Sequence, residues 1–168
     1  IGEKGGFANF TAEYINKNKT LRPGFDFRKG FGEAEIQGFN LFGNMVIPIS
    51  DKTEFYAFGG RNHRDTDAYA FTRNGGPRVV QSIYPGGYTP RITSNIIDNS
   101  MAAGFRTETA SGWKIDISNA FGKNLFHYYT KGTINASLEG ASPTEFDAGG
   151  HSLSQNTTNF DVSKNYDS

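Results

Sequence analysis

The feature that most constrains this chain is a period-two alternation of apolar with polar side chains, repeated in short segments along its length. Successive side chains of a β-strand point to opposite faces of a sheet, so this alternation predicts strands with one apolar face and one polar face. The segment at 113–122 is the clearest, because its large apolar side chains all fall at odd positions. About six segments carry the pattern, at 8–14, 39–47, 54–62, 101–108, 113–122 and 157–163.

The connections between these predicted strands alternate in length. Short connections are expected at 48–52 and 110–112, and long loops around residues 17–35, 64–98 and 123–156. Compact soluble domains seldom contain loops longer than about 15 residues without secondary structure. Outer-membrane barrels, in contrast, have short periplasmic turns at one rim and long external loops at the other. The sequence therefore predicts an all-β, antiparallel up-and-down meander of about six strands that is part of a larger transmembrane β-barrel.

Composition supports a β structure and excludes several kinds of function. The chain of 168 residues contains 21 Gly, 15 Phe and 8 Tyr, and it has no Cys, which excludes thiolate metal sites and Cys nucleophiles. Its 17 Lys and Arg balance 17 Asp and Glu, so no nucleic-acid partner is expected. No apolar run approaches the roughly 18 residues of a transmembrane helix, but a transmembrane strand needs only about 9 to 11 residues.

Both ends of the chain suggest a piece of a longer protein. The chain begins at Ile1 rather than Met, has no opening signal peptide, and stops at Ser168 just after a strand-like segment. Single-chain bacterial barrels start at about eight strands, so six strands are not expected to close a pore. We therefore expect a curved meander whose first and last strands have unpaired edges.

The sequence also predicts which side chains face each way. On the third segment we favour Tyr56 and Phe58 pointing outward, with Ala57, Gly59 and Arg61 pointing inward. For the hairpin around 110–112, Gly112 supplies the left-handed residue that three-residue hairpin loops use. The resulting register pairs Glu108 with Lys114, Arg106 with Asp116, Phe105 with Ile117 and Thr107 with Ile115. It puts two opposite-charge pairs on one face and the apolar pairs on the other.

No constellation of residues requires catalysis. Asp65 and Asp67 form a D-x-D pair, which in a Gly- and Arg-rich segment is more often a solvated turn or a calcium-type oxygen cluster than a pair of glycosidase acids. The histidines His63, His127 and His151 lack metal-ligand spacing. The paired glycines lack the context of a phosphate loop, and no nucleophile elbow accompanies the serines. We expect no enzyme activity, no cofactor and no metal.

Four motifs resemble a known family, the TonB-dependent outer-membrane receptors. They lie at 21–26, 55–61, 83–88 and, above all, 135–150, and together the resemblance covers nearly the whole chain. The resemblance implies a 22-stranded barrel, filled by an amino-terminal plug, in the outer membrane of a Gram-negative bacterium. Residues 1–168 would be a partial barrel domain from which the plug and the remaining strands are absent. Its implied function is the binding and import of a scarce solute with energy supplied by TonB.

The candidate ligand residues lie on the third segment and the loop that follows it, because loops on a rigid scaffold commonly carry recognition. The expected partners are outer-membrane lipid, the transported solute, and the TonB complex through the absent plug. A surface lipoprotein or a neighbouring chain that completes the barrel is a further candidate partner. The solute could be an iron chelate, a cofactor, an oligosaccharide or a peptide. The predicted ligand-contacting residues are Arg61, His63, Arg64, Asp65, Asp67, Tyr69 and Arg73.

A second class of protein fits the same strands. A soluble β-sandwich that binds carbohydrate through aromatic loops would bury the apolar face against a second sheet. The two alternatives differ in what the apolar face contacts: lipid in a receptor, or another apolar face about 10 Å away in a sandwich. A third alternative is a chain that is ordered only as a subunit of a larger assembly.

Overall fold

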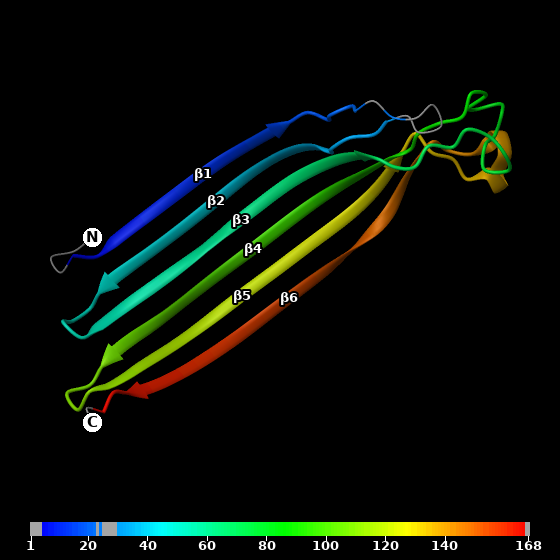
Figure 1. The fold of residues 1–168 in the computed structure, drawn as a ribbon. Helices are drawn as coiled ribbons and strands as arrows, with labels where there is room; N and C mark the ends of the chain where they lie inside the picture. Colours follow the sequence, from blue (N-terminus) through cyan, green and yellow to red (C-terminus); the bar gives the residue numbers. More distant parts are fainter. Residues whose placement is uncertain (1–4, 23, 25–29, 167–168) are drawn as a thin grey trace.

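The described part of the chain forms one open antiparallel sheet. A computed structural model describes residues 5–22, 24 and 30–166. The six strands pair in sequence order, and the described β1 and β6 edges do not pair with each other. Figure 1 shows them side by side in one curved layer, which confirms the antiparallel up-and-down meander. The strands are β1 (Phe7–Lys17), β2 (Glu35–Pro48), β3 (Thr53–Tyr69), β4 (Arg91–Glu108), β5 (Trp113–Lys131) and β6 (Glu145–Lys164), and a short 3₁₀ helix η1 (Ala136–Ala141) precedes β6.

The connections lie at the ends that the sequence predicts. Short turns at 49–52 and 109–112 lie at one end of the sheet, and the long connections lie at the other: 70–90, 132–144 and the described residues 18–22, 24 and 30–34 (Figure 1). The predicted extents of the long loops at 64–98 and 123–156 were wrong, because strand pairing continues through much of both ranges. Polar pairs such as Asp65 with Asn95 extend the ladder there. Backbone pairing does not require apolar side chains, so hydropathy alone located these strand ends too early.

The predicted β4–β5 register is confirmed. Phe105 pairs with Ile117 and Arg106 with Asp116, and Gly112 adopts a φ of 81° in the turn. The expected ion pair between Arg106 and Asp116 is replaced by two other contacts. Arg106 forms an ion pair with Glu54 on β3, while Asp116 accepts a hydrogen bond of 2.8 Å from the hydroxyl of Tyr56. The register therefore follows the prediction, whereas the side chains choose partners from a third strand.

The two faces of the sheet differ most clearly at the short-turn end of β4 to β6, whereas on β1 to β3 the second face also carries the exposed apolar side chains Phe7, Phe42 and Phe58. One face, which we call the apolar face, carries large apolar side chains in most rows of cross-strand pairs, and many are well exposed, including Phe10 at 85% and Met101 at 60%. The other face, called the opposite face, carries the Arg106 and Asp116 row. We define the apolar band as the following residues of the apolar face: Ala8, Phe10, Ala12, Tyr14, Phe39, Leu41, Met45, Ile47, Phe55, Ala57, Met101, Ala103, Phe105, Trp113, Ile115, Ile117, Phe121, Phe160 and Val162.

With the apolar face taken as the outward one, the facing predicted for the third segment was wrong. Ala57, Gly59 and Arg61 lie on the apolar face in register with the band, while Tyr56 and Phe58 lie on the opposite face. Aromatic and small residues occur on both sides of this segment, so its own alternation is weak. Pairing with β2 and β4, whose apolar patterns are clearer, decides the facing.

The apolar band crosses the sheet obliquely. Following the register across the strands, Tyr14 on β1 is level with Ser152 on β6. The uppermost band residue on β6 is Phe160, about eight residues nearer the short turns, which is about 26 Å along a strand. Between these two edge strands, across five strand spacings or about 24 Å, the drop corresponds to an angle of about 45°, while Ile97 on β4 and Leu125 on β5 are isolated apolar residues above this line. The lower boundary moves in the same direction, from Ile47 on β2 to Trp113 on β5.

Very little of the described sheet is buried. The buried apolar side chains among the described residues are Val79 in the connection 70–90 and Ile96 on the opposite face of β4. Among these residues no large side chain is fully buried. Also, no helix in the described ranges is long and apolar enough to cross a membrane. Strand pairing therefore holds the described sheet together, and both of its faces are largely exposed.

Gly104 lets Tyr56 reach across β4 to Asp116. A Cβ added at position 104 would lie 2.7 Å from the ring of Tyr56 and 2.8 Å from the carbonyl oxygen of Ile117. We predict that Gly104→Ala destabilises the sheet by about 1–3 kcal/mol, because side chain and backbone must both move. Gly122→Ala, where an added Cβ meets nothing within 4 Å, should change stability by at most about 0.5 kcal/mol. Equilibrium urea unfolding measures both, and equal midpoints would contradict the argument.

Candidate functional site

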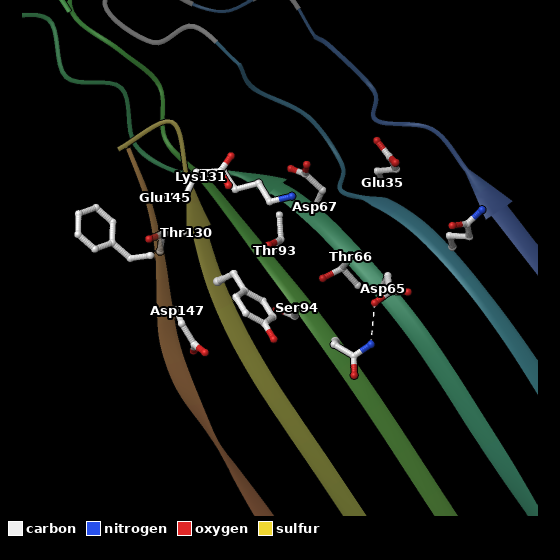
Figure 2. A pocket seen from close by; sticks show the side chains of 14 residues that line it. Glu35, Asp65, Thr66, Asp67, Thr93, Ser94, Thr130, Lys131, Glu145 and Asp147 are labelled. Atoms are coloured by element: carbon white, nitrogen blue, oxygen red, sulfur yellow. Dashed lines mark hydrogen bonds between the residues drawn. The ribbon is translucent and has the colours of Figure 1, made fainter. Parts of the chain in front are cut away.

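A polar hollow of about 590 Å³ lies at the long-loop end of the apolar face. Figure 2 shows its labelled lining residues, which come from β2 through β6. The same face that carries the apolar band nearer the short turns is thus polar and acidic here. The lining residues in register with that face are Glu35, Gln37, Asp65, Asp67, Thr93, Asn95, Tyr129, Lys131, Glu145 and Asp147.

Asp67 is the centre of the ionic contacts on one side of the hollow. Its Oδ2 atom lies 2.9 Å from the Nζ of Lys19 and 2.9 Å from Nη1 of Arg91. Lys19 also approaches Glu35 at 3.5 Å and lies over the ring of Tyr69 at 5.6 Å from its centroid. The second oxygen of Asp67 is buried and has no hydrogen-bond partner among the described residues. This carboxylate therefore keeps one unpaired, buried oxygen, while its other oxygen contacts two cations.

A second cluster of polar side chains links β3 to β4. The amide nitrogen of Asn95 lies 2.8 Å from both Asp65 Oδ1 and His63 Nε2, and Figure 2 marks its bond to Asp65 with a dashed line. The amide donates to the carboxylate of Asp65. Side chains two residues apart on a strand share a face, so Asp65 and Asp67 of the D-x-D pair both line the hollow. Each carboxylate nevertheless has its own hydrogen-bond or ionic partners.

A β-bulge brings Asp147 to the hollow. Tyr128 pairs with Gly149, but Tyr129 pairs with Asp147. Ala148 is therefore the extra residue of the bulge, and Gly149 adopts a φ of 74°. Strict alternation would have put Asp147 on the opposite face. Instead its Oδ1 accepts a hydrogen bond of 2.8 Å from the N–H of Gly149 and lies 2.6 Å from Nε2 of His127. These two contacts, the backbone bond first, lower the pKa of Asp147 below its ordinary value.

The hollow is polar and rich in hydrogen-bond acceptors. Five lining carboxylates surround it, those of Glu35, Asp65, Asp67, Glu145 and Asp147, against the single lining cation Lys131. Figure 2 shows Lys131 reaching toward Asp67. Among the described residues no group of His, Asp and Glu has the geometry to hold a metal ion. The arrangement can accept hydrogen bonds from hydroxyl, amide or cationic groups.

The seven predicted ligand residues do not form one site. Only Asp65 and Asp67 line the hollow, while Arg61, His63 and Tyr69 lie elsewhere on the same face. The other two lie apart from that face: Arg64 on the opposite face, 3.5 Å from Asp98, and Arg73 in the connection 70–90, with its guanidinium 5.4 Å from the centroid of the Phe71 ring. Because side chains alternate between the two faces of β3, residues that are adjacent in the sequence, such as His63 and Arg64, lie on different faces.

The opposite face has its own cluster at the same height. The rings of Phe126 and Tyr128 stack with centroids 4.3 Å apart, and His151 on β6 stacks on Phe126 at 5.6 Å. The amide of Asn124 donates to Asp98 at 2.6 Å. Sequence reasoning missed this cluster and also missed Glu35, Lys19 and Asp147 at the hollow, because their positions depend on the register between distant segments. The aromatic alternation at 126–128 was the one available signal.

Comparisons of the chain with protein-family models, with curated proteins and with solved structures find no match.

We predict that His127→Gln raises the pKa of Asp147 toward, but not up to, its ordinary value, because the bond from Gly149 remains. The folded pKa is lowered, so the contribution of this carboxylate to stability is complete above the ordinary Asp range and is lost as the pH falls through the lowered value. Carboxyl carbon NMR titration measures the change. His63→Gln, which does not touch Asp147, is the control, and an unchanged Asp147 titration in His127→Gln would contradict the prediction.

Proposed function

We propose that this chain is part of an outer-membrane receptor and transporter barrel of a Gram-negative bacterium, which binds a scarce solute and imports it with energy supplied by TonB. The observation that carries the proposal is the oblique apolar band. Transmembrane strands are tilted by about 35–45° and present an apolar band about 25 Å tall to lipid. A band that slopes by about 45° across the strands becomes level with the membrane when the strands tilt by that angle.

The length and polarity of the strands support the same orientation. A transmembrane strand needs about 9 to 11 residues, yet β5 and β6 have 19 and 20 residues. The additional residues lie at the long-loop end and carry the polar hollow. In the proposed orientation this half projects beyond the lipid with the connections 18–34, 70–90 and 132–144, and the short turns face the periplasm.

The open edges of the sheet require further strands in this setting. Unpaired backbone N–H and C=O groups cost several kcal/mol each in hydrocarbon, so β1 and β6 must each pair with another strand. The proposal therefore requires more polypeptide in the barrel wall than the six strands described, from this protein or from a neighbouring chain.

If lipid covers the apolar face, the solute can bind only at the opposite face and the loops. In this assignment Arg64, Asp98, Asn124 and the ring stack of Phe126 and Tyr128 contact the interior of the barrel. Arg73, in the connection 70–90, is available to a solute or a surface lipoprotein from outside. The TonB complex would act on a plug that lies outside this chain, and the assigned role requires no catalytic step.

Spin labels on β4 test the orientation. The chain has no Cys of its own, so single labels can be attached through Met101→Cys on the apolar face and Ala102→Cys on the opposite face. We predict that the Met101 label collides mainly with oxygen, which concentrates in lipid. The Ala102 label should show a higher ratio of collisions with a water-soluble nickel chelate. Continuous-wave saturation measures both ratios in liposomes.

The same labels separate the alternatives. Labels at Ala103 and Phe105 should repeat the behaviour of the Met101 label, and those at Ser100 and Arg106 the behaviour of the Ala102 label, because facing alternates with a period of two. A Met101 label shielded from both reagents would favour the soluble carbohydrate-binding sandwich, whose apolar face is covered by a second sheet. Equal nickel access on both faces would contradict the membrane proposal outright.

A further inference from the structure

Two cations interrupt the apolar face just above the uppermost band residues of β3 and β5, which are Ala57 and Phe121. Arg61 on β3 and Lys123 on β5 each pair in register with Asn99 on β4, so the three side chains form one row on the same face. Neighbouring strands lie about 4.8 Å apart, which puts the α-carbons of Arg61 and Lys123 about 10 Å from each other. Nη1 of Arg61 donates to Oδ1 of Asn99 at 3.1 Å. Arg61 and Lys123 are both exposed.

Neither cation has a carboxylate partner among the described residues. Other cations of the long-loop half do: Lys19 and Arg91 each contact Asp67, and Arg64 contacts Asp98. The nearest acidic position on the apolar face of β3 is Asp65, four residues from Arg61 and about 13 Å along the strand. The row therefore carries two unpaired positive charges toward whatever covers this face.

Apolar side chains flank the row on both sides. Met101 and Phe121 lie in the next row toward the short turns, and Ile97 and Leu125 in the next row toward the long loops. Leu41, which pairs directly with Arg61, is 48% exposed. A molecule that fits here carries a negative charge at the level of the row and extended apolar chains below it.

We propose that Arg61, Asn99 and Lys123 bind the phosphate of an acylated lipid in the outer leaflet. This inference rests on the proposed function, because it requires the apolar face to contact lipid. Phosphate oxygens accept charge-assisted hydrogen bonds from a guanidinium and an ammonium together, and the Nδ2 group of Asn99 is a third donor. The acyl chains pack on Met101, Phe121 and the band below. Arg61 thus contacts lipid rather than the solute to which the sequence assigned it.

Retention of lipid A, a glycolipid with two phosphate groups, tests the site. The protein is exchanged into neutral detergent with lipid A or with dephosphorylated lipid A, and bound lipid is counted by native mass spectrometry. We expect at least fivefold greater retention of the phosphorylated lipid. Arg61→Gln with Lys123→Gln should abolish this preference, whereas Arg61→Lys with Lys123→Arg, which keeps both charges, should preserve it.

A matched double variant controls for net charge. Arg78→Gln with Lys114→Gln also removes two cations, one from an exposed loop position and one from the opposite face, and should retain the preference. Loss of the preference in this control would overturn the assignment to Arg61 and Lys123. Inorganic phosphate at millimolar concentration should not displace lipid A. Complete displacement would identify a simple anion site and would overturn the assignment of the site to a lipid.

A measurement on the unaltered protein does not depend on the folding of variants. Lipid A should slow acetylation of Lys123 severalfold relative to Lys114, and dephosphorylated lipid A should not. Equal protection by both lipids would overturn the phosphate contact.

The spin label at Met101 separates the receptor proposal from the lipid-site proposal. If that label contacts lipid but the phosphorylated lipid is not preferred, the lipid site is wrong and the receptor orientation stands. If the label does not contact lipid, the receptor proposal is wrong and the lipid site falls with it.

Discussion

Backbone hydrogen bonding between neighbouring antiparallel strands is the interaction on which the rest of this structure depends. The described sheet has almost no buried side chains, and most of its large apolar residues lie on one exposed face. Strand pairing satisfies the backbone donors and acceptors whatever the side chains are, so the ladder continues from the apolar rows into rows such as Asp65 with Asn95. This continuity puts an apolar surface and a charged hollow on the same face of one sheet.

Position along the strand and face of the sheet together define the environments of the molecule. On the apolar face, the band occupies the half near the short turns, Arg61 and Lys123 lie just above it on β3 and β5, and the acidic hollow lies beyond them. On the opposite face, the Arg106 and Glu54 pair lies near the short turns and the Phe126 and Tyr128 stack near the loops. The proposed membrane orientation and lipid site both use this division.

The accuracy of the sequence predictions follows the strength of the local pattern. The β5 alternation is clean, and its facing and its register with β4 are as predicted. On β3 aromatic and small residues occupy both sides, and the facing of Tyr56 was wrong. The D-x-D pair could be placed on one face from spacing alone. Glu35 and Asp147 could not be placed beside it, because one comes from a distant strand and the other depends on a bulge.

The sequence by itself determined the strand number, the order of short and long connections, and the hairpin at Gly112, because these depend on period-two alternation and turn chemistry within a few residues. Only the tertiary structure decided how far each strand extends and which carboxylates meet. It also decided the oblique course of the apolar band. These features depend on register summed across six strands and on one extra residue before Gly149, and a shift of one residue moves every later side chain to the other face.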